Sequence, residues 1–193
     1  MGGTAGSPVD SRRSGSSTSG LASDGSGMNS LRKIVSGGQT GVDRAALDLA
    51  IQLRIDHGGW CPAGRLAEDG PIPARYHLQE LASPNYLDRT RRNVLDSDGT
   101  LVICPRAPSG GTLQTIRMAI QARKPFWVIQ CNRRITWKWL AKSIQEHSIE
   151  ILNVAGPRAS RWDDGYSKSQ QVLARLLQEI DPSRWTQPPA DGG

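Results

Sequence analysis

Cysteine is scarce in this sequence of 193 residues. The three cysteines, Cys61, Cys104 and Cys131, lie far apart, and no CxxC pair or Cys/His cluster has the spacing of a metal site. The sequence therefore contains no disulfide framework and no recognisable zinc motif, and we expect no metal ligands. Scattered single cysteines are typical of proteins in reducing compartments, so we expect a cytoplasmic protein.

Long hydrophobic runs are also missing. No stretch approaches the roughly 18 apolar residues of a membrane-spanning helix, and no apolar segment of a signal peptide follows Arg12 and Arg13. Of residues 1–30, 16 are Gly or Ser, a composition that predicts a disordered N-terminal extension. We expect one domain over residues 31–182 and a flexible tail over residues 183–193.

No constellation of catalytic residues is evident. The three histidines, His57, His77 and His147, are far apart in the sequence, and no Ser or Cys has a clear His and acid partner for a triad. The net charge of +6 favours an anionic partner. The arginines form neither a run nor a helical stripe, and no RNA-binding aromatic motif is present. The sequence therefore favours a small phosphorylated molecule over nucleic acid.

Short apolar runs alternate with longer amphipathic segments along residues 33–180. The runs predict strands because a parallel strand that is covered on both faces is apolar nearly throughout. The segments between them carry apolar residues at the spacing of a helix face. The predicted strands are 33–36, 57–61, 100–104, 125–130 and 149–154, and the predicted helices are 42–53, 88–96, 111–122, 137–147 and 167–180. This alternation predicts an α/β, Rossmann-like doubly wound, mainly parallel five-stranded sheet with helices on both faces.

Two glycine-rich segments follow predicted strands and precede predicted helices. In a doubly wound sheet, ligands bind at the carboxyl ends of the strands. Glycines there allow backbone N–H groups to approach a phosphate, and a helix N-terminus adds unpaired N–H groups. Each segment alone could be a tight turn, but the pair predicts an anion-binding cleft. The candidate binding residues are Gly37, Gly38, Gln39, Thr40, Gly41 and Asp43 in the first segment, and Ser109, Gly110, Gly111, Thr112 and Thr115 in the second.

A long irregular segment, residues 62–84, lies between the two glycine loops in the sequence. We expect Arg65 to bind a phosphate at the mouth of the cleft, because a guanidinium can donate two parallel hydrogen bonds to an oxyanion. Glu68 and Asp69 are adjacent acids, a pattern that also occurs in general bases and metal ligands. They could equally pair with Arg65 or Arg75, or be solvated in a turn. Arg89, Arg91, Arg92 and Asn93 offer either a further contact or a solvated helix face.

Four motifs together resemble the family of molybdenum carrier proteins. They are SGGQTGVDRAALDLA, GWCPAGRLAEDGPIP, RTRRNVLDSDGTLVI and SGGTLQT, in this order and spacing, and the match covers roughly Lys33 to Gln130. The resemblance implies a Rossmann-like fold of the nucleotide-sensing group. It also implies a non-catalytic carrier of molybdenum cofactor, a homo-oligomer, whose partners are molybdoenzymes or proteins of cofactor biosynthesis. By position, it implies that the cofactor contacts the candidate residues above, including Arg65, Glu68 and Asp69.

A more distant resemblance is to lysine-decarboxylase-like phosphoribohydrolases, whose signature is Pro-Gly-Gly-x-Gly-Thr-x-x-Glu. Gly111 and Thr112 match its Gly-Thr pair, but Thr115 stands where the acid should be. Glycosidic hydrolysis relies on a nearby carboxylate, so this departure disfavours that activity. The alternative to a carrier is therefore a nucleotide sensor, or a nucleotide-processing enzyme in which Glu68 or Asp69 would supply the carboxylate.

Overall fold

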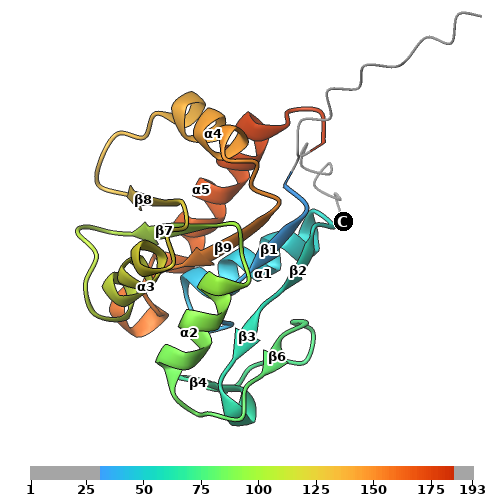
Figure 1. Ribbon diagram of the computed structural model, residues 1–193, viewed down its shortest axis with the longest axis vertical. Coiled ribbons are helices and arrows are strands. Elements are labelled where there is room, and N and C mark those ends of the chain that lie inside the picture. The colour runs from blue at the N-terminus through green and yellow to red at the C-terminus, as the bar shows by residue number, and fades with distance from the viewer. Residues whose placement is uncertain (1–30, 185–193) are drawn as a thin grey trace, which may run out of the picture.

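The computed structural model describes residues 31–184, so the predicted N-terminal extension and residues 185–193 lie outside the described part. Five parallel strands form the main sheet in the order β2-β1-β9-β7-β8 (Figure 1). They are β1 (Lys33–Val35), β2 (Asp56–Gly58), β7 (Gly99–Cys104), β8 (Phe126–Gln130) and β9 (Ile151–Ala155). The predicted five-stranded parallel sheet is confirmed.

Helices cover both faces of this sheet. They are α1 (Val42–Gln52), α2 (Tyr86–Leu95), α3 (Gly110–Gln121), α4 (Trp137–Glu146) and α5 (Gly165–Ile180). Alternate residues of β7 face opposite sides, as the pleat of a strand requires. Leu101 and Ile103 join the large core beneath α1, α4 and α5, whereas Val102 and Cys104 pack with Ile116 of α3. Helices α2 and α3 lie together on this second face (Figure 1).

The predicted strand at 57–61 is divided in the structure. Gly59 has a φ of +123°, and a Cβ there would lie 2.3 Å from the carbonyl oxygen of Ser36. The chain turns at this glycine, so β3 (Trp60–Cys61) leaves the main sheet and pairs with β6 (Gln79–Glu80). A strand prediction from apolar residues cannot detect such a turn, because it depends on the close approach of a distant backbone.

The long segment after β3 forms a small substructure outside the main sheet. It holds the 3₁₀ turn η1 (Ala63–Arg65) and an antiparallel hairpin of β4 (Leu66–Ala67) and β5 (Gly70–Pro71). A second 3₁₀ turn, η2 (Ala159–Arg161), follows β9. Tyr76, Leu78 and Ile72 fill a separate core against Leu47 of α1. This packing holds the hairpin beside the carboxyl edge of the main sheet.

The carboxyl ends of β1, β9 and β7 meet at one edge. Strand β9 pairs with β1 on one side and with β7 on the other, so the loops 36–41, 105–109 and 156–158 converge. Gly156 makes this convergence possible, because a Cβ there would lie 2.3 Å from the carbonyl oxygen of Ile103 and 2.5 Å from Val42. The strand order thus places both predicted glycine loops next to a third loop.

Candidate ligand-binding site

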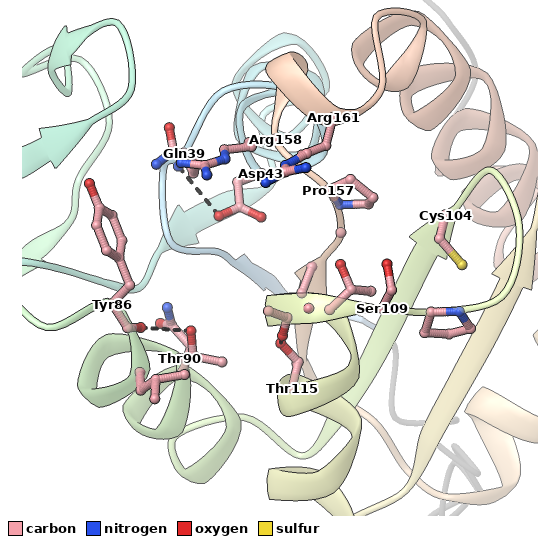
Figure 2. Close-up of a pocket in the computed structure, with 18 of the residues that line it drawn as sticks. Gln39, Asp43, Tyr86, Thr90, Cys104, Ser109, Thr115, Pro157, Arg158 and Arg161 are labelled. Carbon is pink, nitrogen blue, oxygen red and sulfur yellow. Dashed lines mark hydrogen bonds between the residues drawn. The ribbon is translucent and has the colours of Figure 1, made fainter.

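A pocket of about 740 Å³ opens where these three loops meet (Figure 2). Its size is that of a site for a small organic ligand. It is bounded by the first glycine loop, α2, the start of α3 and the loop after β9. The predicted site residues that line it are Gln39, Asp43, Ser109, Gly110, Gly111, Thr112 and Thr115. Other polar residues in the lining are Tyr86, Arg89, Thr90, Asn93, Asn153, Arg158 and Arg161.

The second glycine loop presents an open helix N-terminus to the pocket. Ser109 is the N-cap of α3 but makes no side-chain capping bond. The first N–H groups of a helix have no intrahelical acceptor. A Cβ at Gly110 or Gly111 would meet nothing within 4 Å, and Gly110 has a φ of +53°. The backbone here is therefore bare toward the pocket, and its N–H groups and helix dipole favour an anion.

The first glycine loop is filled by protein instead. The N–H of Val42 donates to the carbonyl of Pro157 at 3.4 Å, so a backbone oxygen takes the position that an anion would have at α1. A Cβ at Gly41 would lie 2.8 Å from that oxygen, and one at Gly38 would lie 2.5 Å from Leu78. Gly37, Gly38, Thr40 and Gly41 are not among the residues that line the pocket. Protein groups thus occupy the space beside these glycines, and the anion contacts predicted for them stay a prediction.

Gly37 leaves room for an arginine. A Cβ at Gly37 would lie 1.4 Å from Nη1 of Arg89. The same Nη1 donates to Oδ2 of Asp43 at 3.0 Å, and the Arg89 and Asp43 side chains are 14% and 4% exposed. Nε of Arg89 is buried without a hydrogen-bond acceptor in the described part of the chain. The guanidinium thus packs against the backbone of Gly37 beside the pocket. Its other N–H groups, including Nε–H, do not donate to Asp43.

Burial dominates the electrostatics of Asp43. It raises the pKa of this carboxyl, although the adjacent Arg89 guanidinium and the Gln39 N–H, which donates to Oδ2 at 3.3 Å, act in the opposite direction. Asp43 therefore closes the first loop onto α1 and orients Arg89. The sequence left open whether it caps the helix or contacts a ligand, and the observed bonds assign it the role of fixing the loop while it lines the pocket.

Glu68 and Asp69 lie at the tip of the β4–β5 hairpin, outside the pocket lining. Glu68 accepts hydrogen bonds from Thr40 and from the backbone and hydroxyl of Ser160, at 3.1 and 2.6 Å. Its Oε2 is 3.4 Å from Nε of Arg158. Asp69 pairs with Arg44, with one N–O distance of 2.7 Å. Both carboxylates are thus engaged by neighbours other than the Arg65 and Arg75 considered from the sequence.

Arg65 stabilises the long loop. Its guanidinium donates to four backbone carbonyls at 2.9–3.2 Å, those of Ile72, Pro73, Tyr76 and Leu78. Arg65 does not line the pocket. Its donors satisfy the irregular backbone between β4 and β6, and phosphate binding by Arg65 stays a prediction. The arginines that line the pocket are Arg89, Arg158 and Arg161.

Sequence reasoning missed the loop after β9. Gly156, Pro157 and Arg158 follow a predicted strand, as both glycine loops do. Their position after a strand was the sequence feature that could have identified this loop as part of the site. The sequence offers Arg89 only as an alternative contact, because helix periodicity does not show which arginine of α2 points inward.

Within residues 31–184, no group of three or more His, Cys, Asp and Glu side chains could hold a metal ion. No helix in the same span is long and apolar enough to cross a membrane.

Fold and pocket together define a doubly wound α/β protein with a ligand site at the carboxyl edge of its sheet. The sequence profile of the circularly permutated YpsA SLOG family matches residues 34–177. The chain belongs to this family, in agreement with the resemblance noted from its motifs.

A solved structure supports this assignment. The crystal structure of a "Putative molybdenum carrier protein" from Syntrophus aciditrophicus SB is 45% identical to this chain, with a TM-score of 0.72. The alignment covers 77% of this chain and 96% of that one. No match was found among curated proteins.

Replacing Arg65 tests its structural role. We expect Arg65→Ala to lower the free energy of unfolding by about 1–3 kcal/mol, because carbonyls of the loop lose charged donors. Urea denaturation measures this loss. Arg91→Ala removes the same charge from an exposed position of α2 and is the matched control. An Arg65→Ala protein as stable as the control would contradict the structural role.

The hairpin carboxylates predict acid sensitivity of the fold. Partial burial raises the pKa of Glu68, but hydrogen bonds from Ser160 and Thr40 outweigh it and bring the pKa below its ordinary 4.5. The hydrogen bond from Arg44 lowers the pKa of Asp69 below its ordinary 3.8. A depressed folded-state pKa adds stability above the unfolded-state pKa, and this stability is lost as the pH falls through the folded-state value.

The corresponding measurement is the free energy of unfolding as a function of pH. We expect Glu68→Gln/Asp69→Asn to flatten the loss of stability that the parent shows as the pH falls below about 4.5. Gln and Asn keep an oxygen acceptor but do not titrate. Identical slopes in the two proteins would show that these carboxylates do not contribute.

Proposed function

We propose that the pocket binds molybdenum cofactor, or a closely related phosphate-bearing anionic cofactor, and that the protein carries or stores it. The observation that carries this proposal is the bare backbone of Gly110 and Gly111 at the start of α3, which opens into the pocket. The relative from Syntrophus aciditrophicus, described as a "Putative molybdenum carrier protein", supports the same role.

The chemistry of the lining suits this ligand. Molybdenum cofactor is a pterin with a phosphate and a dithiolene-held molybdenum. Its phosphate would bind to the N–H groups of Gly110, Gly111 and Thr112, where the helix dipole favours negative charge. Arg89, Arg158 and Arg161 would supply positive charge around it. The proposed site therefore lies between the two glycine loops, but the second loop makes the anion contacts and the first positions Arg89 and Asp43.

A carrier role fits the carboxylates near the pocket. Asp43 is paired with Arg89, and Glu68 with Arg158, so each is held by an arginine. Thr115, at the position of the acid in the phosphoribohydrolase signature, donates its hydroxyl to the carbonyl of Gly111 at 3.1 Å.

A nucleotide sensor or nucleotide-processing enzyme is the alternative, because the carboxyl edge of a doubly wound sheet is where nucleotides also bind. A cytoplasmic location, a homo-oligomer and molybdoenzyme partners stay predictions.

Native mass spectrometry tests the ligand. The protein would be purified anaerobically from a host that makes molybdenum cofactor. The proposal predicts a bound mass equal to the pterin, with or without molybdenum. A nucleotide mass would support the alternative, and incubation with nucleoside monophosphates, followed by chromatography for released base, would then separate sensing from processing.

Introducing a carboxylate at the start of α3 should weaken anion binding. We expect Gly111→Asp to weaken binding of pyrophosphate at least tenfold. The new carboxylate would lie at the free N–H groups at the start of α3 and would repel the anionic ligand. Isothermal titration calorimetry measures this. Gln52→Glu adds the same charge at the exposed end of α1, away from the pocket, and should bind like the parent. Equal affinity of Gly111→Asp and Gln52→Glu would exclude this site.

A methyl group at Gly37 should displace Arg89 without altering any charge. The clash is with the far end of a flexible side chain, so the fold should survive. We expect Gly37→Ala to weaken pyrophosphate binding roughly tenfold, the effect of losing one charged hydrogen bond.

Introducing Gly37→Ala into an Arg89→Ala protein completes a double-mutant cycle. Gly37→Ala should cause no further loss there, because the guanidinium it displaces is already gone. Independent, additive losses would show that Gly37 does not act through Arg89.

A further inference from the structure

Two large apolar side chains stand exposed at the rim of the pocket. Tyr86 and Leu87, the first residues of α2, are 41% and 45% exposed, and both line the pocket. The helix start fixes them in place. Asn85 caps it by accepting a hydrogen bond from the N–H of Leu87 at 2.9 Å, and Thr90 donates to the carbonyl of Tyr86 at 2.8 Å. These bonds fix the backbone from which the two side chains project.

Tyr86 differs from the other two tyrosines. The hydroxyls of Tyr76 and Tyr166 each donate to Asp48 at 2.9 Å, so both belong to a polar network away from the pocket. The Tyr86 hydroxyl has no hydrogen-bond partner among residues 31–184, and its ring stands across the pocket from Ser109 (Figure 2). The packing and bonding of the described chain give no reason for an aromatic ring at this place.

The pocket is also larger than a phosphate requires. At about 740 Å³ it falls within the range of sites for drug-sized molecules. The open N–H groups lie at the start of α3. Helix α2 contributes polar lining residues, Arg89, Thr90 and Asn93, and its first two residues, Tyr86 and Leu87, form an apolar rim. A ligand that filled the pocket would place its anionic end on α3 and a flat apolar part against this rim.

We propose that Tyr86, supported by Leu87, is the specificity-determining residue of the site. It selects phosphate esters of a planar heteroaromatic ring, such as a pterin or a purine, by stacking on that ring. Stacking on an aromatic side chain favours any flat π-system. This inference rests on the proposed function, because the phosphate must first be held at α3.

The test compares three probes that share a phosphate monoester. Ribose 5-phosphate carries no ring system, whereas guanosine monophosphate and a pterin monophosphate do. The parent should bind the two heterocyclic probes more tightly than ribose 5-phosphate. Tyr86→Ala should lower the affinity for both heterocyclic probes roughly tenfold and leave that for ribose 5-phosphate unchanged. Tyr86→Phe keeps the ring without the hydroxyl and should bind like the parent.

A second readout reports the stacking itself. Pterin fluorescence should be quenched on binding to the parent and to Tyr86→Phe, and much less at saturation with Tyr86→Ala. Equal affinities of Tyr86→Ala and the parent for the heterocyclic probes would overturn the role of Tyr86, while ribose 5-phosphate binding that responds to Gly111→Asp would leave the anion site in place. If the parent binds none of the three probes, both the anion site at the start of α3 and the stacking role of Tyr86 are overturned.

Discussion

The insertion of β9 between β1 and β7 is the constraint on which the ligand edge depends. Its parallel pairing with both neighbours brings three strand ends together. Two helix N-termini, those of α1 and α3, then approach the same space. Gly156 lets the loop after β9 pass close to α1, and the Pro157 carbonyl takes the first N–H of that helix. The N-terminus of α3 is left open to the pocket. One strand insertion therefore determines which helix N-terminus is open to the pocket.

The two glycine loops look alike in sequence, but their glycines have different structural roles. The glycines of the first loop make room for protein groups, namely the Arg89 guanidinium, Leu78 and the loop after β9. Those at the start of α3 face open space. In the first case glycine permits a charged side chain to lie against the backbone, and in the second it exposes the backbone itself. Both uses rely on the missing Cβ, and both fit the anion binding that we propose for the pocket.

The sequence was sufficient for the fold class because strand and helix patterns are local, but it did not show the turn at Gly59 that separates β3 from the main sheet. The apolar run of β7 and the helix face of α5 predicted those elements, and strand-helix alternation predicted the sheet. The site was only partly predictable. Asp43 and Arg89 are 46 residues apart and Glu68 and Ser160 are 92 apart, so their pairing follows from tertiary packing. Arg65 looked like a phosphate ligand because a sequence does not show that nearby carbonyls already occupy its donors.

The most direct test of this account follows the backbone amides of the glycines during ligand binding. Selective ¹⁵N-glycine labelling would give separate signals for the glycines of the two loops, and pyrophosphate is a sufficient probe. The account predicts that the amide resonances of Gly110 and Gly111 shift strongly on titration, as expected for N–H groups that donate to an anion, and that those of Gly38 and Gly41 shift little. Strong shifts at Gly38 and Gly41 with none at Gly110 and Gly111 would contradict it and move the anion to the first loop.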